Sequence, residues 1–258
     1  MVNWRNASGR PLASPEWLEA HHTAKLLERR RFVDMLAELQ PRRVIDLGCA
    51  IGLWLELLDE ALPPECELVG IDSDSEALAL AEERSNHWQR SVQLHELDLE
   101  SDAIDIGEGD IALAFNLFPY LPNPAGLVEA VAQSGGALAV RQYDGAALRF
   151  GPMESRLRDS IEASLRASVA SSGQFRHYDM DRVYTLLERA PFRNRKIAFE
   201  FFSRTAPFVE SFVPYYEGTL AWTLDLLSED AAGGLQTWLA DPDSGRYFFE
   251  VDLTAVLS

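Results

Sequence analysis

Strand-length apolar runs alternate with longer, helix-like stretches over the first 145 residues of the chain. The apolar runs are bounded by turn residues, as buried strands are, and lie at 43–47, 68–72, 91–97, 110–116 and 137–142. The longer stretches carry helix start and stop signals and lie at 15–40, 51–62, 73–86 and 123–134, and the one at 51–62 is apolar on nearly every face, which predicts a buried helix. Ser73 and Glu76 form a capping box for the third of these helices. Strands that alternate with helices predict an α/β fold with a parallel sheet and right-handed crossovers.

The pattern changes after residue 145. Helices are predicted at 153–171, 179–189 and 216–240, and Gly233-Gly234 is expected to interrupt the last one. Strands are predicted at 197–202 and 247–257. The second part of the chain therefore adds helices and two further strands to the five strands of the first part.

Polar side chains lie at or just beyond the ends of the five predicted parallel strands. They are Asp46, Asp72, Asp98, Asn116 and Tyr143. The carboxyl ends of parallel strands meet at one edge of a sheet, and ligands bind beyond that edge in open α/β sheets. The five groups therefore predict one ligand site.

The most informative segment is residues 44–54, Val-Ile-Asp-Leu-Gly-Cys-Ala-Ile-Gly-Leu-Trp. Gly48 and Gly52 let the backbone approach a ligand closely, and the following helix points its unpaired N–H groups at that ligand. A dinucleotide-binding site needs G-x-G-x-x-G directly after the strand, and this spacing is different. The Asp46 carboxylate also repels a pyrophosphate, whereas it attracts an ammonium group.

The spacing Asp46-x-Gly48-x-Ala50-x-Gly52 resembles motif I of class I S-adenosylmethionine-dependent methyltransferases, with Ala50 in place of the usual middle glycine. The resemblance implies an α/β fold with a Rossmann-like, seven-stranded, mostly parallel sheet, helices on both faces and an antiparallel last strand. Helical additions are expected to cover the active site. Within one compact domain, the expected parts are an N-terminal helical cap (1–42), a cofactor-binding core (43–145) and a part that completes the sheet and covers the substrate (146–258).

Carried over by position, the resemblance implies S-adenosyl-L-methionine as the cofactor. Asp72, 24 residues after Gly48, would accept hydrogen bonds from both ribose hydroxyls. Asp98 would accept one from the adenine amino group, and the N–H of Leu99 would face the ring. The predicted cofactor-binding residues are Asp46, Gly48, Cys49, Ala50, Gly52, Asp72, Ser73, Asp98, Leu99, Asn116 and Leu117.

Charge argues against a nucleic-acid substrate. The net charge is −18, from 41 acidic and 23 basic residues, and such a surface repels phosphate backbones. The run Arg29-Arg30-Arg31 is interpreted as the solvated face of a helix. Asn-Leu-Phe-Pro-Tyr at 116–120 is a poor match to the Asn-Pro-Pro-Tyr motif of methyltransferases that modify exocyclic amino groups of bases or glutamine amides.

Cys49 and Cys66 give no disulfide framework, and Cys49 is interpreted as a small buried side chain rather than a nucleophile. The first residues form no apolar signal segment, and no run reaches the roughly 18 apolar residues of a membrane helix. We therefore expect a cytoplasmic enzyme with no membrane partner and no metal.

Aromatic residues indicate the kind of acceptor. Of 26 aromatic residues, 16 lie from Phe175 onward, and those that ordinary core packing does not use can wall an apolar pocket. The expected acceptor is a small, largely apolar or aromatic metabolite of bacterial secondary metabolism, methylated at an O, N or C atom. The predicted substrate-binding residues are Tyr120, Arg141, Tyr143, Tyr215 and Tyr216.

A catalytic base is needed only when the acceptor is an O–H or a protonated N–H group, because methyl transfer otherwise requires alignment and exclusion of water. The candidate catalytic residues are His21, His22, Tyr120 and His177. Adjacent helix positions point about 100° apart, so at most one of His21 and His22 faces inward.

Three alternatives remain open from the sequence. The same cofactor site serves enzymes that transfer no methyl group, such as a cyclase or decarboxylase, and proteins that bind the cofactor without catalysis. A protein methyltransferase is the third alternative, since an acidic rim suits Lys- or Arg-rich peptides. The oligomeric state is expected to be monomer or homodimer, with exposed Tyr215-Tyr216 or Trp238 as a possible dimer contact.

Overall fold

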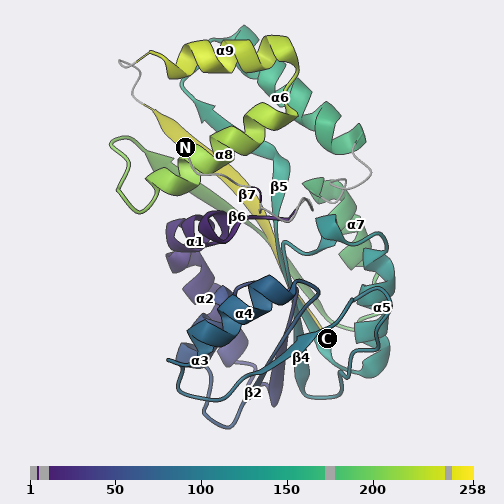
Figure 1. Ribbon diagram of the computed structural model, residues 1–258. Coiled ribbons are helices and arrows are strands. Elements are labelled where there is room, and N and C mark those ends of the chain that lie inside the picture. The colour runs from purple at the N-terminus through teal and green to yellow at the C-terminus, as the bar shows by residue number, and fades with distance from the viewer. Residues whose placement is uncertain (1–4, 6–11, 172–177, 242–245) are drawn as a thin grey trace. The chain divides into compact units, whose positions relative to one another are not determined.

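The strands of the chain form one seven-stranded sheet in the order β3-β2-β1-β4-β5-β7-β6 (Figure 1). The structure is a computed structural model, and it describes Arg5 and residues 12–171, 178–241 and 246–258. The strands are β1 Arg43–Leu47, β2 Glu67–Asp72, β3 Gln93–Glu96, β4 Asp110–Phe115, β5 Ala137–Gly151, β6 Arg195–Thr205 and β7 Tyr247–Leu257. This order confirms the predicted Rossmann-like class.

Strand direction changes after β5. β1 to β5 pair in parallel. The start of β6 meets the end of β7, where the backbones of Asn194 and Ser258 exchange hydrogen bonds. The end of β6 meets the start of β7, where the N–H of Ala206 donates to the carbonyl of Arg246. β6 and β7 are therefore antiparallel, as predicted for the end of the sheet.

The chain divides into two compact units, which are described separately here. Unit 1 comprises residues 1–24, 143–183 and 199–253, and unit 2 comprises 25–142, 184–198 and 254–258. Strands β5, β6 and β7 contribute residues to both units. The three parts predicted from the sequence have other bounds, and their separate roles stay a prediction.

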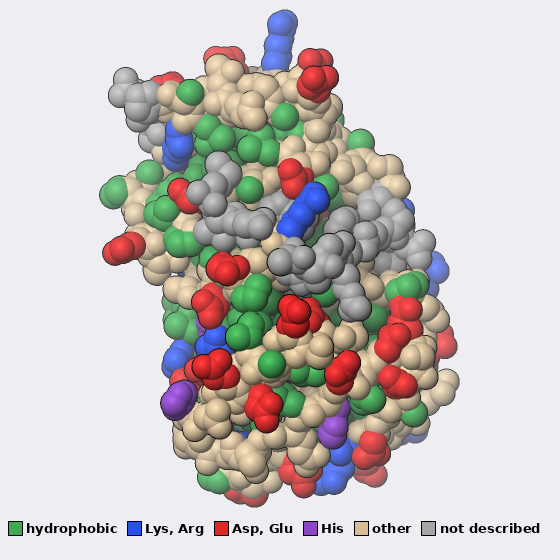
Figure 2. All heavy atoms as spheres, in the orientation of Figure 1, with side chains coloured by type: hydrophobic (Ala, Val, Ile, Leu, Met, Phe, Trp, Pro, Cys, Tyr) green, Lys and Arg blue, Asp and Glu red, His purple; other side chains and the backbone are tan. Residues whose placement is uncertain are grey.

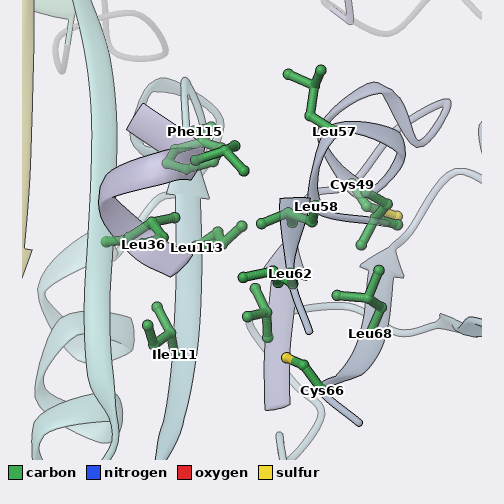
Figure 3. Packing of buried hydrophobic residues seen from close by; sticks show 14 of the residues in the cluster. Leu36, Cys49, Leu57, Leu58, Leu62, Cys66, Leu68, Ile111, Leu113 and Phe115 are labelled. Carbon is green, nitrogen blue, oxygen red and sulfur yellow. The ribbon is translucent and has the colours of Figure 1, made fainter. Parts of the chain in front are cut away.

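Unit 2 holds the parallel part of the sheet and helices α2 (Leu26–Ala37), α3 (Leu53–Ala61), α4 (Ser75–Ser85) and α5 (Pro124–Ser134). Strands β1, β2 and β4 are buried along most of their length, as expected when helices cover both faces, whereas β3 lies at the edge of the sheet and is largely exposed. The resulting core contains Leu36 of α2, Leu58 of α3 and Leu113 of β4 (Figure 3). Asp46 lies within this sheet, between Gly70 of β2 and Leu113 of β4.

The Arg90 guanidinium holds the C-terminal end of α3. Its Nε donates to Oδ1 of Asp59 at 2.9 Å, and its other nitrogens donate to four backbone carbonyls between Asp59 and Cys66 at 2.8–3.1 Å. These carbonyls include helix-end groups that lack partners within the helix. One side chain thus ties the end of α3 to the segment after α4.

Unit 1 contains helices α1 (Pro15–Ala24), α6 (Ser155–Ser171), α8 (Val213–Leu226) and α9 (Glu229–Leu239). Helix α7 (Met180–Arg189) has residues in both units. Figure 1 shows α6, α8 and α9 grouped together, and both α8 and α9 contact α6. The core of this unit is largely aromatic and includes Phe150, Phe202, Phe212, Tyr215 and Phe248.

Three predicted element bounds are wrong. The helix expected over 15–40 is broken at Lys25, whose φ of −110° and ψ of 18° are not helical, and its two halves belong to different units. The strand predicted at 137–142 continues to Gly151, and every residue from 143 to 151 is buried or half-buried. The expected break at Gly233-Gly234 lies instead at Leu227-Ser228, between α8 and α9.

The capping box predicted for α4 is also wrong. Asp74, not Ser73, is the N-cap, and its carboxylate accepts hydrogen bonds from the N–H groups of Glu76 and Ala77. Both residue types suit an N-cap, and the carboxylate has the added attraction to the helix N-terminus. Ser73 is exposed.

Acidic side chains are spread over the face of the molecule shown in Figure 2. This agrees with the net charge of −18. Within the residues that the structure describes, we find no helix with both the length and the apolar character needed to cross a bilayer.

Candidate functional site

The turn between β1 and α3 contains three residues with left-handed backbone. The φ angle is +74° at Gly48, +46° at Ala50 and +79° at Gly52. A Cβ on Gly48 would lie 2.9 Å from Cδ1 of Leu117, so no side chain fits there without movement. Ala50 adopts its conformation at a cost of about 1–2 kcal/mol, which a glycine would avoid. The positive φ angles at these three positions, two of them glycine, form the tight backbone turn that a ligand lying against the main chain requires.

Asp72, at the end of β2, is turned toward this same turn. Its Oδ2 accepts a hydrogen bond from the N–H of Ala50 at 2.8 Å, and its Oδ1 accepts one from the N–H of Asp74 at 2.9 Å. Burial raises the pKa of the carboxyl, and these backbone N–H groups lower it. A carboxylate offers about four lone-pair sites, so each oxygen can accept one further hydrogen bond. The carboxylate therefore suits a ligand with two adjacent hydroxyls.

Asp46, in β1, is 1% exposed. Its Oδ2 is buried and has no hydrogen-bond partner among the residues described. Burial and the Asp72 carboxylate raise the pKa of Asp46 to about 7, and the charge of Arg29 opposes that rise. A buried carboxylate oxygen without a donor is unfavourable, and an ammonium group supplies both the charge and the donors. Asp46 thus suits an amino group bound at the turn.

Arg29 of α2 is a site residue that the sequence analysis missed, because its interpretation as part of a solvated run is wrong. The residue is 5% exposed, and its guanidinium carbon lies 4.7 Å from the ring centroid of Trp54 in the first turn of α3. Arg30 is exposed and pairs with Glu60. Helical spacing carried the signal, since Arg29 shares a face with the buried Val33 and Leu36.

Cys49 lies in the turn but has no reactive character. It is buried, and burial together with the Asp46 and Asp72 carboxylates raises the pKa of its thiol well above the ordinary value. A thiol that stays protonated is a poor nucleophile. The interpretation of Cys49 as a packing residue is therefore supported, and Cys66 is also free and buried.

Asp98 and Leu99 follow β3 in a short loop of unit 2. The Asp98 carboxylate is exposed and accepts a hydrogen bond from the N–H of Glu100, while its own N–H donates to Asp102. The loop is tied to the site, because the N–H of Leu97 donates to the carbonyl of Asp72 at 3.0 Å. A contact of Asp98 with adenine stays a prediction.

Asn116, Leu117 and Tyr120 follow β4. Asn116 has a φ of +51°, and its N–H donates to the carbonyl of Arg141 at 2.8 Å. Leu117 is buried against Gly48, and Tyr120 ends the short 3₁₀ helix η1 (Phe118–Tyr120) and is half-buried. The segment after β4 therefore borders the glycine turn, as predicted for the cofactor side of the site.

The predicted substrate-binding residues are divided between the two units. Arg141 is buried in β5 of that unit. Tyr143, Tyr215 and Tyr216 belong to unit 1, and the last two are buried rather than exposed, so the idea that they form an exposed dimer contact is wrong.

The predicted catalytic histidines have different outcomes. His21 of α1 is buried and His22 is half-buried, so one of the adjacent pair faces inward, as expected. His177 lies outside the described residues. None of these positions tests a catalytic role, which stays a prediction.

An aromatic and acidic cluster surrounds Tyr215 in unit 1. The Tyr215 ring stacks on Trp17 and His21, with centroids 5.1 and 5.0 Å away. Its hydroxyl donates to the carboxylate of Glu250 and lies 2.7 Å from both oxygens. Burial and the Glu250 charge raise the pKa of the phenol well above its ordinary value. The sequence analysis missed Glu250, a buried acid at an inward position of β7.

Comparison with known proteins supports the interpretation of the turn. A family described as "Methyltransferase domain" matches residues 45–134, the segment that contains the turn, Asp72 and Asn116. This match covers the part of the chain on which motif I depends.

Two curated relatives match much the same region. A protein-lysine N-methyltransferase (efm4) of Schizosaccharomyces pombe is 36% identical over 94 residues, which cover 34% of this chain and 37% of that protein. A ubiquinone biosynthesis O-methyltransferase of Methylococcus capsulatus is 28% identical over 114 residues, which cover 43% and 47%. The chain thus spans less than half the length of these relatives. Their names refer to different acceptors, so the matched region does not indicate which acceptor this chain uses.

A solved structure shows the same fold. A putative methyltransferase from Bacillus halodurans superposes with a TM-score of 0.57 and 15% identity, covering 88% of this chain and 97% of the other. The fold of this structure and the methyltransferase-domain match over residues 45–134 support the resemblance of motif I to class I S-adenosylmethionine-dependent methyltransferases. S-adenosylmethionine is the cofactor of this class, in agreement with the cofactor predicted.

Proposed function

We propose that this protein binds S-adenosylmethionine through unit 2 and transfers its methyl group to a small, largely apolar or aromatic metabolite. The observation that carries the cofactor part is the Asp72 carboxylate, which the N–H of Ala50 holds against a glycine turn with left-handed backbone. Both features suit an adenosyl nucleoside that lies against the backbone.

The residues present fit the cofactor group by group. Asp72 keeps an acceptor site on each oxygen for the two ribose hydroxyls, and Asp98 with Leu99 is assigned to the adenine. Asp46 has a buried oxygen without a partner among the described residues, which suits the amino group. When bound, the cofactor supplies a methyl group on a positively charged sulfur. The protein's task is then to align the acceptor and exclude water.

The aromatic side chains of unit 1 support an apolar or aromatic acceptor. Tyr143 lies 4.8 Å from Tyr178 and 6.0 Å from Trp222, measured between ring centroids. Aromatic rings in such clusters bind flat or apolar ligands through their faces and edges. Tyr143 is half-buried while Tyr178 and Trp222 are buried, so Tyr143 is the member assigned to contact the acceptor.

His21 is the residue assigned to proton transfer. Its ring meets the edge of Tyr143 with centroids 6.1 Å apart and stacks on Tyr215. An acceptor hydroxyl beside Tyr143 would bring its proton toward this imidazole, and an imidazole accepts a proton near neutral pH. A carbanion or neutral amine acceptor requires no such step.

Protein methylation is the second candidate function. The relative from Schizosaccharomyces pombe bears the name of a protein-lysine methyltransferase, and the net charge of −18 attracts Lys-rich segments. This candidate predicts label in protein, whereas the first predicts label in small molecules.

One experiment separates the candidates. The purified protein is incubated with S-adenosylmethionine labelled in the methyl group, together with fractionated bacterial metabolites or with Lys-rich peptides. Label in an extracted small molecule supports the first proposal, and label in peptide supports the second. Cofactor binding by calorimetry with label in neither fraction would contradict methyl transfer and favour a non-methylating enzyme or a binding protein.

A further inference from the structure

Two interactions locate the head group of Arg29. Its guanidinium lies 4.7 Å from the ring centroid of Trp54, and its charge acts on the Asp46 carboxylate. Trp54 is in the first turn of α3, two residues after Gly52. Asp46 lies near the end of β1, two residues before Gly48. The guanidinium therefore lies next to the first turn of α3 and close enough to Asp46 for its charge to act on that carboxylate.

The turn thus combines a buried cation with a buried anion. Arg29 is 5% exposed and Asp46 is 1% exposed, so both charges lie in the protein interior, where charge interactions are stronger than in water. The amino-acid end of S-adenosylmethionine carries the complementary pair, an ammonium and a carboxylate on one carbon. A guanidinium binds a carboxylate through two parallel N–H donors, which a lysine does not offer.

We propose that Arg29 binds the carboxylate of the cofactor's amino-acid end, while Asp46 faces its ammonium. This inference rests on the proposed cofactor site and adds to it a residue from helix α2. Stacking on Trp54 engages the face of the guanidinium, so its in-plane N–H donors keep the geometry that a carboxylate needs. Trp54 is thereby a positioning residue for Arg29.

The competing explanation is that Arg29 only offsets the charge of Asp46. Both explanations predict that loss of Arg29 affects the site. They differ in which part of the ligand is sensed, because a counter-ion to Asp46 acts on the ammonium and a carboxylate ligand acts on the carboxylate. A ligand that keeps the ammonium and sulfonium but lacks the carboxylate distinguishes them.

The test is calorimetric titration with S-adenosylmethionine and with its decarboxylated form, which differ only in the carboxylate. We expect wild type to bind S-adenosylmethionine about 10- to 100-fold more tightly than the decarboxylated form. In Arg29→Gln this ratio should fall to about 1, because only S-adenosylmethionine loses a contact. Arg30→Gln is the matched control, since Arg30 is exposed and pairs with Glu60, and it should keep the wild-type ratio.

Arg29→Lys keeps a positive charge near Asp46 and serves if Arg29→Gln does not fold, as judged by thermal unfolding. We expect it to reduce the ratio at least about threefold, since the ammonium of lysine cannot bind the carboxylate through two parallel donors. The inference is overturned if both variants fold and both keep the wild-type ratio of the two affinities. If only Arg29→Lys folds, an unchanged ratio in that variant overturns it. If wild type binds neither ligand, the proposed cofactor site itself fails, which is a different outcome.

Discussion

The two units use buried polar groups in different ways. In unit 2 Asp46 and Asp72 lie near the strand ends beside the glycine turn, and one oxygen of Asp46 has no partner among the described residues. In unit 1 the buried acid Glu250 is bound by the hydroxyl of Tyr215, whose ring is enclosed by other aromatic rings. Unit 2 thus has hydrogen-bonding capacity left for a ligand. In unit 1, Tyr215 and Glu250 use part of their hydrogen-bonding capacity on each other.

This difference suggests a division of labour. A site with remaining acceptors can bind the invariant part of a reaction, the cofactor, with a few defined hydrogen bonds. In a unit with an aromatic core, the rings that line a site can be exchanged to suit one acceptor, because apolar packing depends less on direction than hydrogen bonds do. The predictions below test whether the polar groups of the two units can be separated in this way.

The largest effect is expected from Asp72→Asn. Asp72 would accept two hydrogen bonds from the ribose, and bonds to a charged acceptor contribute about 1.5–3 kcal/mol each. We expect the affinity for S-adenosylhomocysteine, measured by calorimetry, to fall about 100-fold or more. Asp74→Asn is the control, because asparagine caps a helix as well as aspartate and Asp74 is not assigned to the ligand. Equal affinities in Asp72→Asn and wild type would contradict the ribose assignment.

Buried hydroxyls in unit 1 should affect stability and not cofactor binding. Tyr215→Phe leaves the buried Glu250 carboxylate without this donor and should lower the free energy of unfolding by about 2 kcal/mol. Thr223 is also buried, but its hydroxyl has no partner within the described part of the chain, so Thr223→Val should raise that energy by about 1 kcal/mol. Chemical denaturation measures both. A fall in cofactor affinity in either variant would break the proposed separation of the units.

The pKa of Asp46 predicts how cofactor affinity depends on pH. Burial raises this pKa to about 7, so the carboxyl is mostly neutral at pH 6 and mostly ionised at pH 8. The ammonium of the ligand requires the ionised form, and binding therefore releases a proton around neutral pH. We expect the affinity for S-adenosylhomocysteine to rise about tenfold from pH 6 to pH 8 in wild type. Calorimetry of Asp46→Asn should show no such rise. If the affinity of this variant still rises between pH 6 and pH 8, another group causes the pH dependence.

The smallest effect is expected at Ala50. Its φ of +46° lies in the left-handed region, which glycine adopts freely. Ala50→Gly should stabilise the protein by about 1 kcal/mol. Ala79→Gly is the opposite control, because this exposed residue lies within α4, and glycine there should destabilise the protein by about 1 kcal/mol. Thermal unfolding measures both, and a loss of stability in Ala50→Gly would mean that the methyl group packs favourably.

The fold and the turn could be predicted because their signals are local. Gly48, Ala50 and Gly52 lie within five residues, and Asp72 follows the next predicted strand, so a short stretch of sequence carries most of the cofactor site. Alternation of strands and helices gave the parallel part of the sheet, whose pairing the structure confirms.

The remaining features depend on contacts between distant segments. Glu250 is satisfied by a tyrosine 35 residues earlier, and no pattern within β7 shows that partner. Arg29 looked solvated because two exposed arginines follow it, although the helical period placed it on the buried face. The break at Lys25 has no glycine or proline to mark it, so local propensity could not reveal it.

Helix α3 is held at both ends by groups that belong to the protein itself. Gly52 starts it at the turn, and five hydrogen bonds from Arg90 fix the carboxylate and carbonyls at its other end. We therefore expect the turn to need little rearrangement when a ligand binds. Such pre-organisation lowers the cost of ordering the site, so a larger share of the contact free energy appears in the affinity.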